Sequence, residues 1–509
     1  MQWTSAGSAS AVMLGRRPLA SSCLPPSTCA LCAVHRHREF RMRWSKTAVW
    51  LLLATTTALS GCASVGPQFA PPQVEAPPHF PEVGATSDET RVSARWWSAF
   101  GASQLDALVE EAMCNSPTVA EADATLDAAR AARDAAFGGL FPQIDAVTGA
   151  ERTRVNAAAF GFEGFPTVEV SRYTAGVGVS YDLDLFGGQR RARESAGAWL
   201  EAELFRNHAA RLTLAADITA TAIDAAVASA ELETIERIVL DDAQTLDLVE
   251  RALAAGAVAH LDRIRAQSQL AQDASEIPRI RSRLAGAQTQ LSILVGRTPG
   301  AGAPIGFALD DFEVPLTPQS VPSALLRGRP DILAAEAALH AATADIGVRV
   351  ASLYPQIRLS GDYTQTSLRP DTLFQYSSAG WSLGPTIRLP LFNGGSLRAE
   401  VRRAEADARR ADARYRATVL RAFGQVTNAY VEVALAAEQR DLLGQSLALA
   451  EENLRLSRRA YETGAGTLLG VIDAQRQANL ARRAHVRAVG GHLAAIAKLY
   501  SAISTAPLG

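Results

Sequence analysis

The sequence predicts a mixed α and β membrane protein in which one pattern of helix and strand signals occurs twice along the chain. Three observations support this prediction. A Pro-Gln pair occurs at positions 142–143 and again at 355–356, an offset of 213 residues (355 − 142). Segments with period-two alternation follow both pairs, as expected for half-apolar strands. Alanine-rich tracts come next, with no proline between Ser396 and Ala506, so these tracts are predicted to be long helices.

Composition narrows the possible classes of protein. The chain has 509 residues, of which 48% are hydrophobic and 20% charged, and its formal net charge is −2. This length allows two ordinary domains or one elongated domain. A nearly neutral chain is not expected to be a dedicated nucleic-acid binder.

A secretory signal begins at Met42. A basic stretch precedes the apolar segment 48–58, which is too short to span a bilayer as a helix of about 20 residues. The sequence LSGC at 59–62 then matches the lipobox of bacterial lipoproteins, in which the cysteine is lipidated and becomes the mature N-terminus. Lipidation of Cys62, with an alanine next to it, predicts an anchor in the outer membrane. An ordinary signal with a chance cysteine is the alternative.

Residues 1–41 precede this complete signal, so we expect translation to start at Met42. The cysteines and histidines of this extension offer a metal site as the alternative interpretation. In the exported chain only Cys62 and Cys114 remain. With Cys62 acylated, Cys114 has no disulfide partner, and we expect it to be a small buried apolar residue.

A tether precedes the part of the chain that is predicted to fold into helices and strands. Residues 63–95 contain six prolines, which favour an extended segment leading from the lipid to the body. Each half then opens with a short helical stretch, which follows Pro117 in the first half and Pro330 in the second. These stretches end before Pro142 and Pro355, because proline pushes the preceding residue into an extended conformation.

Two alternating segments follow each Pro-Gln pair and predict a β-hairpin in each half. In the first half the clearer strand covers 173–185, and a loop of roughly 152–172 separates it from a strand that starts at Ile144. In the second half the strands start at Ile357 and Trp381. Aromatic and branched side chains gather on one predicted face, and Gly, Ser, Thr, Asp and Arg on the other.

Long helices are predicted after the hairpins. Apolar residues recur at steps of three and four over 401–433, which is a helix seam. A helix over Ser396–Glu462 would be about 100 Å long at 1.5 Å per residue. In the first half, a corresponding long helix is predicted over Gln189–Ala255. Each long helix ends at a glycine-marked turn, at Gly256 and Gly464, beyond which a second helix returns.

These patterns divide the chain into five parts. They are an upstream extension with a lipoprotein signal peptide (1–61), a lipid-anchored proline-rich tether (62–95), a first structural repeat (96–297), a connector strap (298–322) and a second structural repeat (323–509).

Four strands per chain are too few to close a barrel, and their open edges would leave backbone groups unpaired. In hydrocarbon each such group costs several kcal/mol, so only closed barrels are tolerated there. Three chains would supply twelve strands, an even number within the outer-membrane range. The alternative is a soluble β-sandwich attached to a coiled coil, which the few strands and very long helical arms disfavour.

Several segments together resemble the TolC-type outer-membrane efflux channels, and most closely the NodT-like lipoproteins that serve resistance-nodulation-division (RND) pumps. The likeness covers Gly61–Ser504. It rests on the lipobox, ARWWSAFGASQLDALVEEAMCNSP at 94–117, the two PQI phrases, LFNGGSLRAE at 391–400 and YETGAGTLLGVIDAQRQ at 461–477.

The resemblance implies a homotrimer with a 12-stranded β-barrel in the outer membrane, continued by a 12-helix α-barrel across the periplasm. It also implies a periplasmic adaptor protein and an inner-membrane RND transporter as partners. The expected function is a passive exit duct for small molecules. A duct for secreted polypeptides and a non-conducting lipid-anchored periplasmic scaffold are the alternatives.

In the family, inward side chains just after the second turn close the periplasmic mouth. This carries over to Asp473 and Arg476 as gate residues, while Gly470 occupies a position that is commonly acidic. A ring of three Asp473 side chains would attract cations, and Arg476 would bridge to a neighbouring chain. A solvated pair within one helix is the alternative. The turns at Gly256 and Gly464 resemble adaptor-docking tips, with plain turn glycines as the alternative.

No catalytic constellation is found in the sequence, which lacks HExxH, a phosphate-binding loop and a nucleophile elbow. Its histidines are scattered. We therefore expect no enzymatic activity, no metal, no nucleic-acid partner and no cofactor beyond the covalent lipid on Cys62. The sequence does not identify the exported compounds, because a passive duct takes its cargo from the pump.

Overall fold

The structure is a computed structural model that describes residues 64–72, 95–156, 167–301, 304–317 and 328–505. These residues all belong to one of the two units into which the chain divides, Cys62–Gly509. The predicted start at Met42 and the predicted lipidation of Cys62 lie outside the described residues.

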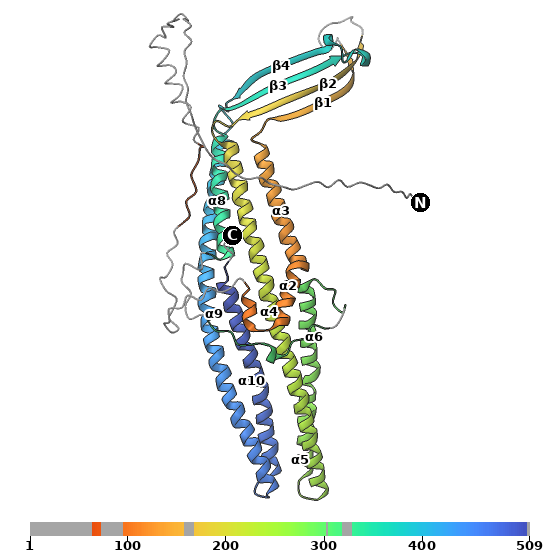
Figure 1. The fold of residues 1–509 in the computed structure, drawn as a ribbon, viewed down its shortest axis with the longest axis vertical. Coiled ribbons are helices and arrows are strands. Elements are labelled where there is room, and N and C mark those ends of the chain that lie inside the picture. Colours follow the sequence, from red (N-terminus) through yellow and green to blue (C-terminus); the bar gives the residue numbers. More distant parts are fainter. Residues whose placement is uncertain (1–63, 73–94, 157–166, 302–303, 318–327, 506–509) are drawn as a thin grey trace, which may run out of the picture. The chain divides into compact units, whose positions relative to one another are not determined.

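Helices make up most of the described residues, and one sheet accompanies them (Figure 1). In chain order the principal elements are η1 (Trp96–Phe100), α2 (Ser103–Asn115), α3 (Pro117–Gly138), β1 (Gln143–Val155), β2 (Val168–Leu183), α4 (Gly188–Ala254), α5 (His260–Ala274), α6 (Glu276–Val295), η3 (Leu309–Asp311), α8 (Pro330–Ala351), β3 (Gln356–Ser367), β4 (Ala379–Arg388), α9 (Ser396–Glu462) and α10 (Leu468–Ile503).

The four strands form one antiparallel sheet in the order β1-β2-β3-β4. Each predicted hairpin is present, and the pairing of β2 with β3 joins the two hairpins into a single sheet. Among the described residues, the outer edges of β1 and β4 have no partner strand. The sheet is therefore open on both sides.

The strand register gathers apolar side chains on one face of the sheet. Val177 pairs with Tyr363, and Tyr363 pairs with Trp381, so the three lie in a row across β2, β3 and β4. The other described residues do not cover this face, since Trp381 is 77% exposed and Leu383 is 68% exposed. An uncovered apolar face of this kind marks an interaction surface.

The other face of the sheet is polar. Asp182 of β2 stands opposite Arg358 of β3, whose Nε and Nη2 donate to the two carboxylate oxygens at 2.6 and 2.9 Å. Asp362 and Ser382 form a second cross-strand contact on this face. The predicted division into an apolar and a polar face is confirmed.

The first loop is shorter than the sequence predicts. Residues 152–172 were expected to form a loop, yet β1 continues to Val155 and β2 begins at Val168. Cross-strand ion pairs explain the extension, since Arg152 pairs with Glu169 at 2.7 Å and Arg172 pairs with the β1 residue Glu151. Such pairs depend on the register of two strands and cannot be read from alternation along one of them.

The long helices agree closely with their predictions. Helix α9 covers Ser396–Glu462 as expected, and α4 begins and ends one residue before the predicted range. Each follows a glycine in the left-handed conformation, with φ of 78° at Gly187 and 84° at Gly395. At α4, the carboxylate of Asp184 accepts hydrogen bonds from the first-turn N–H groups of Gln189 and Arg190, which satisfies two of the free donors there.

The returning helices differ between the halves. Helix α10 runs unbroken over Leu468–Ile503, whereas the first return is divided into α5 and α6 at Ser275. Pro278 lies in the first turn of α6. Because proline lacks an N–H and clashes with the preceding turn, it is tolerated only near a helix start. A single return helix was predicted in both halves, so the expectation was wrong for the first half.

The main core lies where helices of both halves meet. Trp96 and Phe100 of η1, Ile218 of α4 and Ile496 of α10 are almost completely buried in one cluster. Trp96 also stacks on Tyr500 of α10, with ring centroids 6.2 Å apart. Part of α4 is apolar enough to cross a membrane by length and composition, but 56% of that part is buried within the chain, as in a core helix.

Cys114 does not lie in a core. The apolar side of α2 consists of Leu105, Leu108, Val109 and Ala112, which are buried, whereas Cys114 near the C-terminal end of α2 is exposed. The expected burial of Cys114 is therefore wrong. Helical phase decides the matter, because Cys114 lies off the apolar stripe.

Candidate functional site

The two turns that join the long helices to their returning partners share one geometry. Gly256 and Gly464 have φ of 73° and 76°. After α4, the N–H of Gly256 donates to Leu253 O, and the next N–H donates to Ala252 O, both at 2.9 Å. After α9, the N–H of Gly464 donates to Tyr461 O at 3.0 Å, and the next residue donates to Ala460 O at 2.8 Å. Both are Schellman caps, which need a left-handed residue at the glycine position.

The helices that follow the turns are capped in different ways. At α5, the carboxylate of Asp262 accepts the N–H of Ala259 at 3.1 Å. At α10, the hydroxyl of Thr467 accepts the N–H of Gly470 at 3.2 Å. Both turns lie at the end of the long helices far from the sheet, because α4 and α9 begin next to the strands and end at the turns (Figure 1).

The two tips contact each other through a small apolar cluster. Val249 of α4, Ala266 of α5 and Leu468 of α10 are buried together. The start of α10 is thus packed against the first helical hairpin. Any movement of α10 at this end must separate these side chains.

The structure places Asp473 in the second turn of α10 and Arg476 in the third, both on the exposed surface of the helix. In the part of the chain that the structure describes, no ion pair or hydrogen bond joins these two residues or links either of them to another group. The alternative of a paired couple within α10 is therefore not observed.

Buried polar side chains lie between α10 and the first hairpin, close behind Asp473. Asp242 of α4, Asp273 of α5, and Gln475 and Asn479 of α10 are all buried, with exposed fractions between 3% and 7%. In the described residues, one carboxylate oxygen of Asp242, the amide nitrogen of Gln475 and both polar atoms of Asn479 have no hydrogen-bond partner. A buried polar group left without any partner costs about 1–3 kcal/mol.

Asp242 is the most perturbed carboxyl group of this interface. Burial, together with the neighbouring Asp273 carboxyl, raises the pKa of Asp242 to about 7. Asp273 itself accepts a hydrogen bond from Gln269 at 2.7 Å and lies 3.5 Å from Arg483 of α10. A proton on Asp242 relieves the repulsion between the two carboxyl groups.

Three arginines of α10 form ion pairs with the first hairpin or with α9. Arg482 lies 2.9 Å from Glu451 of α9 and 3.8 Å from Asp241 of α4. Arg487 lies 2.8 Å from Glu231 of α4. Together with Arg483, these residues hold the middle of α10 against α4, α5 and α9.

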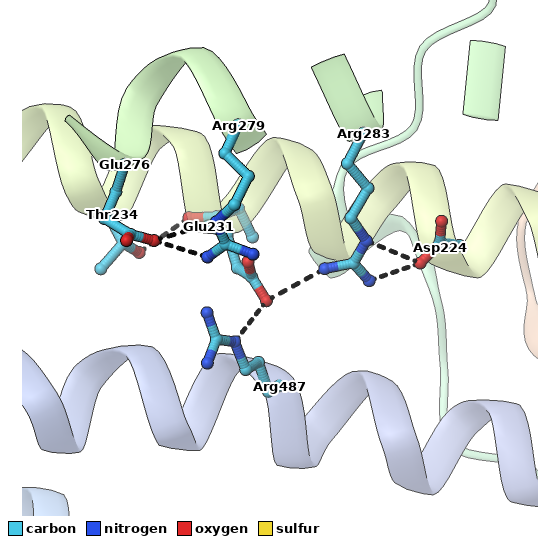
Figure 2. A network of polar contacts seen from close by, with 8 residues as sticks. Asp224, Glu231, Thr234, Glu276, Arg279, Arg283 and Arg487 are labelled. Atoms are coloured by element: carbon cyan, nitrogen blue, oxygen red, sulfur yellow. Dashed lines mark hydrogen bonds and ion pairs between the residues drawn. The ribbon is translucent and has the colours of Figure 1, made fainter. Parts of the chain in front are cut away.

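Glu231 is the best buried of these acceptors, with only 2% of its surface exposed. Figure 2 shows the guanidinium groups of Arg283 from α6 and Arg487 from α10 directed at its carboxylate. Arg283 in turn pairs with Asp224. A buried carboxylate held by two cations is costly to disturb, because breaking such a pair leaves an uncompensated charge.

Sequence reasoning did not find Asp242, Asp273, Glu231 or Arg487. Charged residues at helical spacing look alike whether they face water or a neighbouring helix. Arg487 and Glu231 are separated by 256 positions, so no local pattern links them. Only the packing of α10 against α4 reveals the pair.

Comparison with known proteins decides the family. Residues 108–297 and 321–505 match the family model described as outer membrane efflux protein. The chain belongs to the outer membrane efflux protein family. It is the outer-membrane channel component of an efflux pump, and the sequence-based resemblance to TolC-type channels of the NodT-like branch is confirmed.

Relatives of this outer membrane efflux protein span almost its full length. Nodulation protein T of Rhizobium leguminosarum bv. trifolii is 30% identical over 455 residues, which cover 88% of this chain and 94% of that protein. Pyoverdine export outer membrane protein OpmQ of Pseudomonas aeruginosa is 30% identical over 457 residues, covering 89% and 95%. The solved outer-membrane channel OprN superposes with a TM-score of 0.78 at 28% identity, covering 87% of this chain and 99% of OprN.

Proposed function

We propose that three copies of the chain form a passive exit duct for small molecules across the periplasm and the outer membrane. The observation that carries this proposal is the open four-stranded sheet, apolar and uncovered on one face and polar on the other. Three such sheets, joined edge to edge, close a 12-stranded barrel whose apolar face meets lipid. The polar face, with Asp182 and Arg358, would then line water.

The helices continue this duct. Two helices of 67 residues in each chain, α4 and α9, are each about 100 Å long at 1.5 Å per residue. We infer that they and their shorter partners, arranged as a two-fold repeat within each chain, supply four of the twelve helices of a periplasmic α-barrel. The five-part division at 1–61, 62–95, 96–297, 298–322 and 323–509 belongs to the same proposal.

The lipid and the partners complete the assembly. We propose that Cys62 carries the acyl chains that anchor each copy in the outer membrane, and that no other cofactor is needed. A periplasmic adaptor protein would dock at the tips formed by Gly256 and Gly464, and an inner-membrane RND transporter would deliver the cargo. The name of OpmQ, a pyoverdine export protein, supports a small-molecule cargo. A transport role of this kind involves no enzymatic step.

Asp473 and Arg476 form the proposed gate at the periplasmic mouth. Both are exposed one turn apart on α10, and the described chain offers neither of them a partner. Across a three-fold axis, Asp473 would form a ring of like charges that attracts cations, and Arg476 would bridge to the neighbouring chain.

Purified full-length lipoprotein in detergent tests the proposal. We expect a heat-sensitive oligomer on gels, three chains by mass, and discrete conductance steps in planar bilayers. An oligomer without conductance would contradict the duct and favour the periplasmic scaffold. A conducting trimer that co-purifies with a polypeptide-secretion adaptor would favour the alternative of a duct for secreted polypeptides.

A further inference from the structure

A groove of about 770 Å³ runs along α8, between the start of α9 and the upper part of α4. Its floor consists of small residues of α8, such as Ala338 and Ala342. Its floor and both walls belong to one chain, so the groove does not depend on how copies assemble.

Arginines dominate the walls of this groove. Four carboxylate side chains and six arginines line it. The arginines are Arg206, Arg349, Arg403, Arg410, Arg414 and Arg421. Arg403 and Arg410 share Asp407, at 4.0 and 3.0 Å.

Three of the six are not neutralised. In the described residues, Arg349, Arg414 and Arg421 have no carboxylate within ion-pair distance. Arg421 donates instead to neutral groups of its own helix, the carbonyl of Ala417 and the hydroxyl of Thr418. Unpaired guanidinium groups in a groove attract anions and bind carboxylates or phosphates through their planar forks.

Residues 64–72, the described part of the tether, lie against one face of α8. Phe69 stacks on His340 with ring centroids 4.5 Å apart. The carbonyl of Val65 accepts a hydrogen bond from Arg191 at 3.3 Å, and a Cβ added at Gly347 would approach that carbonyl to 2.8 Å. Residues 64–72 are thus pressed against α8 at His340 and Gly347.

The groove lies on the other side of α8 from this tether. Ala338 and Ala342 are two positions before and after His340, and each position turns the helix by about 100°. Residues two positions apart therefore point in nearly opposite directions. The same holds for Arg349, two positions after Gly347.

This arrangement decides which face is inside the proposed duct. The described part of the tether, residues 64–72, begins two residues after Cys62. The acyl chains proposed for Cys62 would lie in the leaflet that surrounds the barrel. A segment tied to that leaflet must follow the outer wall. The opposite face of α8, with the groove, must then line the tunnel.

We propose that the groove is an anion-binding belt inside the duct, and that three copies of it favour the passage of small organic anions, such as carboxylates, over cations. The inference rests on the proposed function, since it needs a closed tunnel with the tether outside. Arg414 and Arg421 are the residues that carry it. Rings of arginine select anions in pores because their charge attracts counter-ions into a confined channel.

Two matched variants test the belt in the full-length trimer. R414Q/R421Q removes two unpaired charges from the groove. R402Q/R409Q removes two exposed arginines of α9 that do not line the groove and have no carboxylate partner in the described chain. All four side chains are exposed, so neither variant should disturb folding, and R414K/R421K restores the charge.

Reversal potentials in a KCl gradient and block by citrate are the readouts. We expect R414Q/R421Q to lower the chloride-to-potassium permeability ratio about threefold and to raise the citrate concentration for half-block about fivefold. R402Q/R409Q and R414K/R421K should behave like the parent chain. Unchanged selectivity and citrate block in a conducting R414Q/R421Q trimer would overturn the belt alone. A trimer with no conductance would overturn the duct, and the belt with it.

Discussion

Asp242 is a residue whose surroundings depart far from those of an ordinary carboxylate. Its pKa is raised to about 7 by burial and by the neighbouring Asp273 carboxyl, with Asp241 adding to the effect. In the unfolded chain the same carboxyl ionises near its usual value of 3.8. Between these two pH values the folded chain therefore holds one more proton than the unfolded chain.

This difference predicts that stability falls as pH rises. The contribution of protonated Asp242 is fully present below about pH 4 and is lost as pH passes through about 7, a change on the order of 2–4 kcal/mol. We expect a lower Tm in detergent at pH 8 than at pH 5.5. D242N should remove most of the difference, whereas D247N, an exposed aspartate on the same helix, should keep it. An equal pH dependence in D242N would contradict the assignment.

The proposed gate gives a second prediction at this scale. D473A should raise single-channel conductance about twofold or more and weaken block by trivalent cations, because it removes the ring of like charges. D247A is the matched control. Asp247 lies nine positions before Gly256 (256 − 247), as Asp473 lies nine after Gly464 (473 − 464). Conductance and block unchanged in D473A would remove Asp473 from the gate.

Among the elements, the two tip turns have a backbone conformation that depends on a single glycine each. Both glycines adopt a left-handed conformation, and nothing lies within 4 Å of a Cβ built on either. Any cost of adding a side chain there is therefore conformational rather than steric.

G464A is expected to destabilise the tip by about 1 kcal/mol, which corresponds to amide exchange in the turn that is about fivefold faster. Hydrogen exchange followed by mass spectrometry would measure it. G286A is the control, since Gly286 lies exposed within α6 with open space around it, where alanine is the better helix former. Equal protection of the turn in G464A and the parent chain would contradict the argument.

At the scale of the whole molecule, the proposed barrel would place the exposed apolar face of the sheet in contact with lipid. Ion pairs and hydrogen bonds of the polar face link neighbouring strands, while the apolar face contributes to no core cluster of the described chain. In the proposed barrel, closure by several copies would pair the free edges of β1 and β4, and the surrounding lipid would cover the apolar face.

A charge on that face should oppose insertion. L383R is expected to cost about 2–4 kcal/mol near the middle of the bilayer and to reduce the heat-sensitive trimer recovered from outer membranes. S382R is the matched control one residue away, where the new cation would lie beside Asp362 on the polar face. Equal trimer yields from the two variants would show that Leu383 does not face lipid.

Local patterns in the chain were sufficient for the strands, the long helices and the tip glycines. Period-two alternation, helical seams and proline positions depend on residues a few positions apart, so they determined α9 to the residue and α4 to within one residue. They also located both turns and the two faces of the sheet. The same patterns failed for the first loop, for the break at Ser275 and for Cys114, where strand register, a single proline or helical phase decided the outcome.

Tertiary structure alone decided which charged residues matter. Arg487 meets Glu231, Asp242 meets Asp273, and the tether covers the side of α8 opposite the arginines, although these partners are tens to hundreds of positions apart in the chain. The charge and the helical spacing of a set of residues do not show whether the helix face that carries them is solvated or buried. The free energy of a side chain depends on what packs against it, and docking of whole helices determines that contact.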